Sequence, residues 1–391
     1  MQTRNFVWVG HALFALLAGC SNAHEGRVEP PSGYDAGPAV TPDTDGGAPP
    51  VVDGSTPIGS DAAAPPDGGT AVASALEDCL DEGGHLVTVD TVNNNDVEDH
   101  GAISAFAVSP DRTIAAAGTD GTIKFWTLDA LVGTVRSAEL LYGAEIDAAE
   151  ASDMQFIGDH VAAGDLQGLV AEWGADGFMR VLGGTDPDTP IVAVAIDAAR
   201  RFLAHADNRA GGHVMVRAMD GTSVTGPLDT SFALVTDLAF LPSGALLVAG
   251  RSAAGAPLVE LRAASDFARV ETHFERTGAV GTFSEIAASA DGSRIAAASG
   301  DEIALLDGAL GSPVVADVAG HGALSVSIGA TGRYVLSAGT DGTLRALAAG
   351  DGHEAARADV IDPISVRIDP RGELVFVATR GALIHAFACE R

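Results

Sequence analysis

Positive charge is scarce in this chain. Lys and Arg together number 22 against 53 Asp and Glu, the formal net charge at pH 7 is -31, and Lys124 is the single lysine. A chain this acidic repels the phosphates of nucleic acids and anionic lipid surfaces, so we expect no nucleic-acid partner. We interpret the charge as that of a solvated, soluble surface rather than of an acid-specific binding site.

The sequence patterns of common catalytic sites are also absent. The chain has no G-x-S-x-G nucleophile turn, no H-E-x-x-H pair and no Gly-rich loop between a strand and a helix that would hold a phosphate. Clear helical periodicity is missing as well, so we expect no helix-borne site. The sequence therefore predicts no catalytic residue, no bound metal and no cofactor.

No hydrophobic run at the N-terminus is long enough to span a membrane. Residues 6–18 are apolar apart from Gly10 and His11, whereas a transmembrane helix needs about 20 apolar residues. Arg4 precedes this run, and Leu17-Ala18-Gly19-Cys20 ends it. These features are typical of a cleaved signal peptide over residues 1–19.

The end of this signal resembles a bacterial lipobox, in which the cysteine after the cleavage point is lipidated. The resemblance implies that Cys20 carries acyl chains such as palmitate, which hold a protein at a membrane surface without a spanning helix. The alternative is an ordinary secretory signal whose Cys20 pairs with another cysteine. Ser21 stands where an Asp retains some lipoproteins at the inner membrane, which favours the outer membrane, on its periplasmic or its surface side.

Residues 20–72 form the predicted tether. This stretch has no hydrophobic periodicity and is rich in Pro, Gly, Asp, Ala and Thr, so it cannot bury enough apolar surface to offset its ordering entropy. The motif Asp43-Thr44-Asp45-Gly46 resembles the start of a calcium loop but lacks the distal ligands. We expect a disordered spacer that holds a folded domain away from the membrane.

Residues 103–128 define a repeating unit. Their pattern predicts three strands, at 103–108, 114–118 and 122–128, joined by turns at Ser109-Pro110-Asp111 and Thr119-Asp120-Gly121. Similar units follow at a spacing of roughly 40 to 50 residues, the period of four-stranded propeller blades. The small residues that end the second strands are Gly118, Gly164, Ala206, Gly250, Ser299, Gly339 and Thr379. The sequence therefore predicts an all-β, seven-bladed β-propeller over residues 73–391.

The first and sixth units resemble the WD40 family. In that family a His, a Ser or Thr, an Asp and a Trp form a buried hydrogen-bond network within a blade. The resemblance, which covers residues 86–391, implies this structural role for His100, Asp120, Trp126, His321, Ser337 and Asp341.

The WD40-like pattern is degenerate. Ala116 stands at the hydroxyl position of the first unit, and Leu347 replaces the Trp of the sixth. The Trp-Asp dipeptide occurs nowhere, since Trp126 is followed by Thr127 and Trp173 by Gly174. The sequence therefore predicts a seven-bladed ring whose blade networks are only partial.

The last unit ends at its third strand, so the ring needs a fourth strand from elsewhere. Residues 85–92 alternate between polar and apolar, which predicts the outer strand of the seventh blade, antiparallel to residues 382–388. Cys79 shortly precedes the first segment and Cys389 follows the second. In an oxidising compartment we expect these two residues to form a disulfide; the alternative is two unpaired thiols near the seam.

Two histidine settings have alternative interpretations. His205, Asp207 and His213 flank an irregular hairpin and have the residue types of a metal site, although surface polar residues at a lengthened turn explain them better. His100 and His321 have the residue type of catalytic bases, but the blade network explains their spacing from Asp120 and Asp341 better.

These features favour a lipid-anchored, monomeric propeller that binds an envelope or surface protein or peptide and has no catalytic activity. The membrane is contacted through the lipid alone. The alternative is a propeller-fold enzyme of the envelope, of the lactonase, glycosidase or quinone-dependent dehydrogenase type, whose site would need several convergent polar residues near the ring centre.

Overall fold

The computed structural model describes residues 74–93, 102–110, 112–119, 121–128, 135–140, 150–174, 179–184, 189–209, 211–220 and 224–391. The predicted signal peptide, Cys20 and the tether up to residue 72 lie outside these ranges, as do His100 and Asp120. Within the described ranges, no helix has the length and apolar character needed to cross a membrane.

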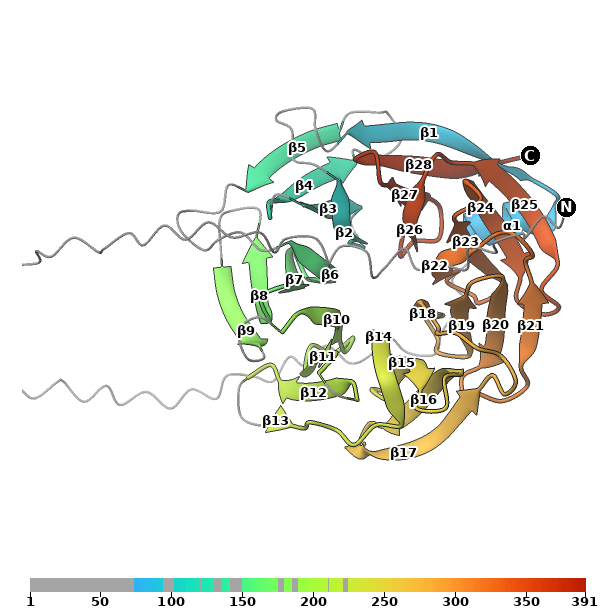
Figure 1. Ribbon diagram of the computed structural model, residues 1–391. Coiled ribbons are helices and arrows are strands. Elements are labelled where there is room, and N and C mark those ends of the chain that lie inside the picture. Colours follow the sequence, from blue (N-terminus) through green and yellow to red (C-terminus); the bar gives the residue numbers. More distant parts are fainter. Residues whose placement is uncertain are drawn as a thin grey trace, which may run out of the picture. The chain divides into compact units, whose positions relative to one another are not determined.

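Seven four-stranded antiparallel sheets form the blades of a ring (Figure 1). Blade 1 consists of β2 (Ile103–Val108), β3 (Thr113–Gly118), β4 (Ile123–Leu128) and β5 (Val135–Leu140). Blade 2 consists of β6 (Ala151–Ile157), β7 (His160–Asp165), β8 (Leu169–Gly174) and β9 (Met179–Gly184). Blade 3 consists of β10 (Ile191–Ile196), β11 (Phe202–Asp207), β12 (His213–Ala218) and β13 (Val224–Thr225).

Blades 4 to 6 continue the same order from the innermost to the outermost strand. Blade 4 consists of β14 (Phe232–Phe240), β15 (Leu246–Ser252), β16 (Pro257–Ala263) and β17 (Asp266–Glu275). Blade 5 consists of β18 (Glu285–Ala288), β19 (Arg294–Ser299), β20 (Glu302–Asp307) and β21 (Val314–Asp317). Blade 6 consists of β22 (Ala323–Ile328), β23 (Tyr334–Gly339), β24 (Thr343–Ala348) and β25 (Glu354–Asp359).

Blade 7 joins the two ends of the folded chain. It consists of β26 (Pro363–Ile368), β27 (Val375–Thr379), β28 (Leu383–Glu390) and, as its outer strand, β1 (His85–Asn93). Strands β1 and β28 are antiparallel, with Leu86 opposite Cys389 and Val87 opposite Ala388. The predicted seven-bladed ring and its closure by an N-terminal strand are both confirmed.

A disulfide supports the closure. Cys79 and Cys389 are bonded, with Cα atoms 6.0 Å apart and a sequence separation of 310, as the sequence predicted. In the chain-entropy model, closing a loop of this size lowers the conformational entropy of the unfolded chain, which stabilises the fold by about 5 kcal/mol. The bond therefore ties the start of the domain to its last strand.

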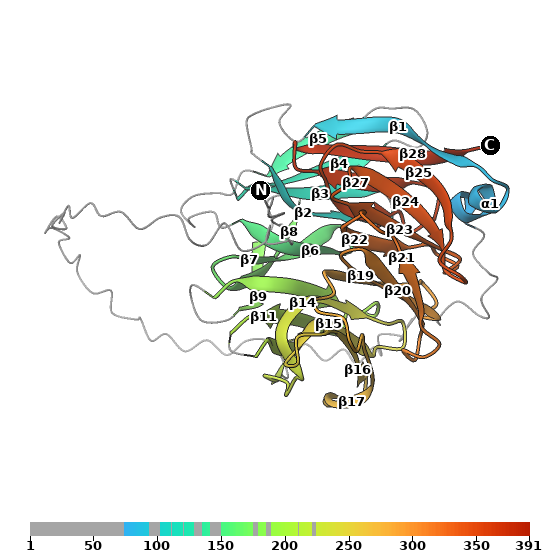
Figure 2. The same ribbon diagram turned by 45° about the vertical axis from the view of Figure 1, so that its right-hand side comes forward.

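The sequence pattern did not reveal the single helix found among the described residues, α1 (Ala75–Asp81), which precedes β1. Its N-cap is Ser74, whose hydroxyl accepts a hydrogen bond from the amide of Glu77. Leu76 and Leu80 are buried against blades 6 and 7. Figure 2 shows the helix at the edge of the ring, beside those blades.

The core consists of apolar clusters between neighbouring blades. The described residues form seven such clusters, and each spans one pair of adjacent blades, including the pair of blades 7 and 1. Small side chains let the flat sheets approach closely, and Ala115, Ala116 and Ala117 are all fully buried. An unbroken set of interfaces explains why an alanine-rich sequence can stabilise a large ring.

Candidate functional site

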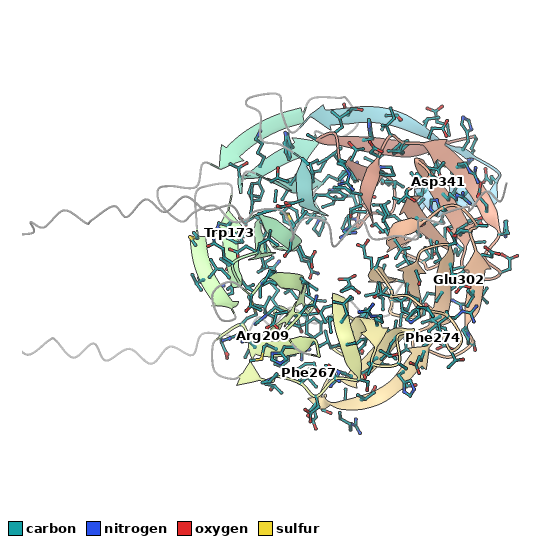
Figure 3. The ribbon with its side chains drawn as sticks, viewed as in Figure 1. Trp173, Arg209, Phe267, Phe274, Glu302 and Asp341 are labelled. Carbon is teal, nitrogen blue, oxygen red and sulfur yellow. A yellow bond between two sulfur atoms is a disulfide. The ribbon has the colours of Figure 1, made fainter. Side chains whose placement is uncertain are left out.

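The predicted blade network is present in blade 6. His321 lies 2.9 Å from Asp341 (Nδ1 to Oδ1) and 3.0 Å from Ser337 (Nε2 to Oγ). Because the carboxylate accepts, Nδ1 carries the proton and Nε2 accepts from the Ser337 hydroxyl. Asp341, labelled in Figure 3, also accepts from Thr343 at 2.8 Å and from Arg345 at 2.6 Å.

This network is built to keep the histidine neutral and the aspartate charged. Burial lowers the pKa of His321, although the Asp341 carboxylate opposes that shift. Burial alone would raise the pKa of Asp341, but hydrogen bonds from Arg345, Thr343 and His321 lower it to about 2. The ring of His321 is fully buried with both nitrogens hydrogen-bonded, so the network stabilises the hairpin of blade 6.

Of the network predicted for blade 1, only Trp126 lies among the described residues. Trp126 is buried at the interface of blades 7 and 1, in the same apolar cluster as Phe376 and Ile384. In blade 6, Leu347 fills the equivalent place in the interface with blade 5. The substitution of Trp by Leu thus keeps the apolar contact.

The sequence predicts that His205, Asp207 and His213 of blade 3 are surface residues at a lengthened turn, and the structure differs from this prediction. His205 and Asp207 are almost fully buried, at 0% and 1% exposure, so a surface location is wrong for both. His213 is paired with Asp207 across the two strands, and its Nδ1 lies 3.7 Å from Asp207 Oδ1. No group of three or more metal-ligating side chains lies together anywhere in the described ranges.

His205 has no hydrogen-bond partner at either ring nitrogen within the described part of the chain. Burial, and next the nearby cation of Arg217, lower its pKa to about 4. A buried imidazole without a hydrogen-bond partner costs free energy, so His205 is a weak point of the fold.

The centre of the ring is lined by the innermost strands. On several of them a polar side chain accepts a hydrogen bond from a backbone amide of the next blade. These pairs are Asp153 with Val194 at 2.7 Å, Asp237 with Ile286 at 2.8 Å, Glu285 with Val326 at 3.2 Å and Ser325 with Val366 at 2.9 Å. Each bond links one blade to the next at its inner edge.

Three carboxylates, of Asp153, Asp237 and Glu285, interact electrostatically with the Arg367 guanidinium at this centre. Arg367 of blade 7 donates to Glu285 of blade 5. Burial raises the pKa of Asp153 to about 6, and burial together with Glu285 and Asp153 raises the pKa of Asp237 well above its ordinary value. These residues lie on β6, β14, β18 and β26, the innermost strands of blades 2, 4, 5 and 7.

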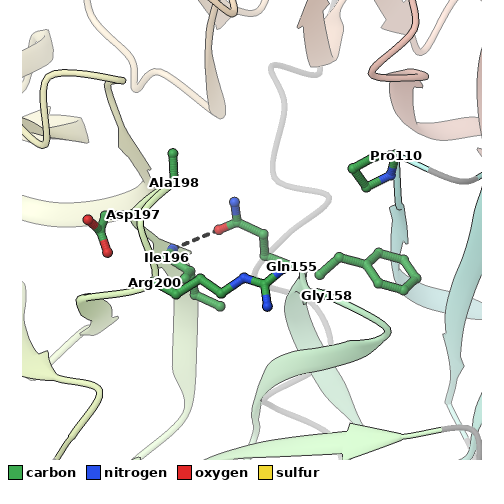
Figure 4. Close-up of a pocket in the computed structure, with 8 residues that line it drawn as sticks. Pro110, Gln155, Gly158, Ile196, Asp197, Ala198 and Arg200 are labelled. Carbon is green, nitrogen blue, oxygen red and sulfur yellow. Dashed lines mark hydrogen bonds between the residues drawn. The ribbon is translucent and has the colours of Figure 1, made fainter. Parts of the chain in front are cut away.

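A pocket lies beside this centre, where the innermost strands of blades 1 to 3 end. We call the turn that joins the innermost strand of a blade to its second strand the first turn. The pocket has a volume of about 320 Å³, and Figure 4 shows its lining. The lining residues are Pro110, Gln155, Phe156, Gly158, Ile196, Asp197, Ala198 and Arg200.

The pocket combines apolar walls with two donors. Gln155 uses its side-chain oxygen to accept from the Ile196 amide at 2.8 Å (Figure 4), so its amide nitrogen is directed elsewhere. Arg200 brings a guanidinium, and Phe156 and Pro110 supply apolar surface. The sequence did not reveal this pocket, because its residues belong to three different repeats.

Comparison with known proteins supports the repeat assignment. Residues 93–127 match the family model described as WD domain, G-beta repeat. No curated protein matches the chain. The chain therefore contains a WD40 repeat within a seven-bladed β-propeller, an architecture that commonly serves as a protein-binding scaffold.

Proposed function

We propose that this chain is a bacterial lipoprotein, anchored in the cell envelope through Cys20, whose propeller binds a protein or peptide partner. The observation that carries the proposal is the rigid seven-bladed ring with its WD40 repeat. Loops and turns of seven blades converge on each face of such a ring, and function belongs to those surfaces rather than to the fold.

The anchor rests on the sequence Leu17-Ala18-Gly19-Cys20 and on the Pro- and Asp-rich tether that follows it. An acyl chain on Cys20 would hold the ring near a membrane, and the tether would let it reach a partner. Ser21 favours the outer membrane over the inner one.

Fractionation tests the anchor. The Cys20→Ser chain is expected to leave the membrane fraction and to lose incorporation of labelled palmitate. Cys79→Ser is the matched control and should keep both. Membrane retention of the Cys20→Ser chain would contradict the proposal.

An envelope enzyme is the second candidate, and the ring centre is the observation that favours it. A carboxyl group with a pKa near 6, such as that of Asp153, has the acidity of a general acid or base. However, both oxygens of Asp153 already accept backbone amides, from Met154 and Val194, which suits a structural link better. Turnover of a lactone or a glycoside that is lost in Asp153→Asn would favour the enzyme.

A further inference from the structure

Arg200 occupies a position that is glycine in the first turns of blades 4 to 7. In these turns the fourth residue has a positive φ and its amide donates to the carbonyl oxygen of the first residue, as Gly372 does to Asp369. In blades 4 to 7 this residue is Gly244, Gly292, Gly332 or Gly372. Arg200 adopts the same backbone with φ of 55°, a conformation that costs a non-glycine residue on the order of 1 kcal/mol.

Blade 1 makes the same exception, and there the reason is visible. Arg112, with φ of 67°, is buried and donates to Asp369 at 2.9 Å and also to Glu373. Its side chain thus links blade 1 to blade 7 across the seam. The unfavourable backbone is offset by a buried ion pair.

Arg200 has no such compensation in the described part of the chain. No hydrogen bond or ion pair to its guanidinium is found there, whereas its neighbour Arg201 pairs with Asp197 at 3.0 Å. The Arg200 guanidinium lies over Gly158, where an added Cβ would come within 3.0 Å of Nη1. A side chain at Gly158 would therefore displace the guanidinium from the pocket wall.

The geometry points to a ligand with one carboxylate and one apolar group. We propose that the pocket binds the C-terminal carboxylate of a partner chain that ends in an apolar residue. Arg200 and the side-chain amide nitrogen of Gln155 bind the carboxylate, and the last side chain lies against Phe156 and Pro110. This assignment rests on the proposed peptide-binding function and specifies its partner.

The charge of the chain selects this ligand over a strongly acidic segment. A net charge of -31 repels a run of carboxylates. A single terminal carboxylate is repelled less and is attracted by the nearby Arg200 guanidinium. The molecule already holds a carboxylate at a first turn: Glu77 of α1 accepts from the amides of Thr331 and Arg333 in blade 6, at 3.1 and 3.0 Å.

Three peptide probes test the proposal by ligand-observed NMR titration of the full-length chain in detergent micelles. The probes are acetyl-Ala-Ala-Phe with a free carboxylate, the same peptide as its C-terminal amide, and acetyl-Ala-Glu-Ala amide. We expect the free acid to bind at least about tenfold more tightly than its amide, as the loss of one charge-assisted hydrogen bond implies. The Glu peptide should bind no better than the amide.

Variants identify the residue responsible. Arg200→Gln should weaken binding of the free acid about tenfold, while Arg201→Gln, its matched control, should change it less than twofold. Equal binding of acid and amide, or an unchanged affinity in Arg200→Gln, would overturn the assignment. A Glu peptide that binds as tightly as the free acid would overturn the C-terminal source. If probe binding fails while a partner is still captured by the propeller, only the pocket assignment is wrong.

Discussion

At the scale of single residues, His205 is the clearest unsatisfied group. It is fully buried between blades and has no hydrogen-bond partner among the described residues. The charged groups that act on it are Arg217, Asp207 and Arg209. Burial is the main reason that protonation of the ring is unfavourable; Arg217 and Arg209 add to it, and Asp207 opposes them.

His205 makes the fold sensitive to acid. Its pKa falls from 6.5 in the unfolded chain to about 4 in the folded one, so the unfolded chain binds the proton more tightly. The contribution to stability is complete above pH 6.5 and is lost as the pH falls toward 4. On acidification from pH 7.5 to pH 4.5, the titration of His205 should lower the free energy of unfolding by about 2–3 kcal/mol.

Urea unfolding at the two pH values measures that cost. His205→Leu removes the titrating group and the unpaired nitrogens, so the loss of stability on acidification should shrink by about 2 kcal/mol. His353→Leu is the control, because His353 is exposed and bonded to Asp351. The same acid sensitivity in His205→Leu and in the parent chain would disprove this role.

At the scale of elements, α1 completes a turn that blade 6 cannot complete alone. In blades 3 and 7 the first residue of the first turn is Asp197 or Asp369, whose carboxylate caps the amides that follow. In blade 6 this residue is Gly329. The Glu77 carboxylate takes the missing place and accepts from Arg333 at 3.0 Å and Tyr334 at 3.3 Å.

The glycine is required by this arrangement. A Cβ on Gly329 would lie 2.2 Å from Glu77 Oε1, so Gly329→Ala must displace the carboxylate and leave buried amides unpaired. We expect a loss of about 1–3 kcal/mol and faster hydrogen exchange in α1. Gly350→Ala is the matched control, since a Cβ there meets nothing within 4 Å.

A rescue distinguishes this role from simple crowding. Glu77→Ala should destabilise the chain by a similar amount, and adding Gly329→Asp should restore much of the loss, because Asp then caps the turn as in blades 3 and 7. No recovery in the double variant would show that Glu77 does not act as the cap.

The elements differ in how well the sequence predicts them. Strand β1 was predicted over residues 85–92 from their polar and apolar pattern, and the two cysteines mark its neighbours. Helix α1 has only seven residues and buries Leu76 and Leu80, which is too short for helical periodicity to stand out. Ser74 and Glu77, three residues apart, were the available signal of a helix start.

At the scale of the whole molecule, the ring is stable because it is closed. Each blade packs on two others, and the seam between blades 7 and 1 has its own apolar cluster. The sequence predicted the number of blades because the period is local. It did not predict the central carboxylates, because Asp153, Asp237 and Glu285 come from different blades and acquire their environment only when the ring forms.

Loss of the disulfide should reveal how far closure stabilises the ring. With Cys79→Ser and Cys389→Ser together, the unfolding free energy should fall by up to about 5 kcal/mol. The blades themselves should keep their circular dichroism. Identical urea unfolding with and without a reducing agent would contradict a structural role for the bond.

The most direct test of the account is site-specific photo-cross-linking in intact cells. A photoreactive residue at Ala198, on the exposed rim of the pocket, is expected to give one or two discrete adducts. Arg200→Gln should reduce them, and the same residue at Val181 on outer strand β9, which is 59% exposed, should give none. Absence of adducts at Ala198, or the same adducts at Val181, would contradict a propeller that binds its partner at the first turns.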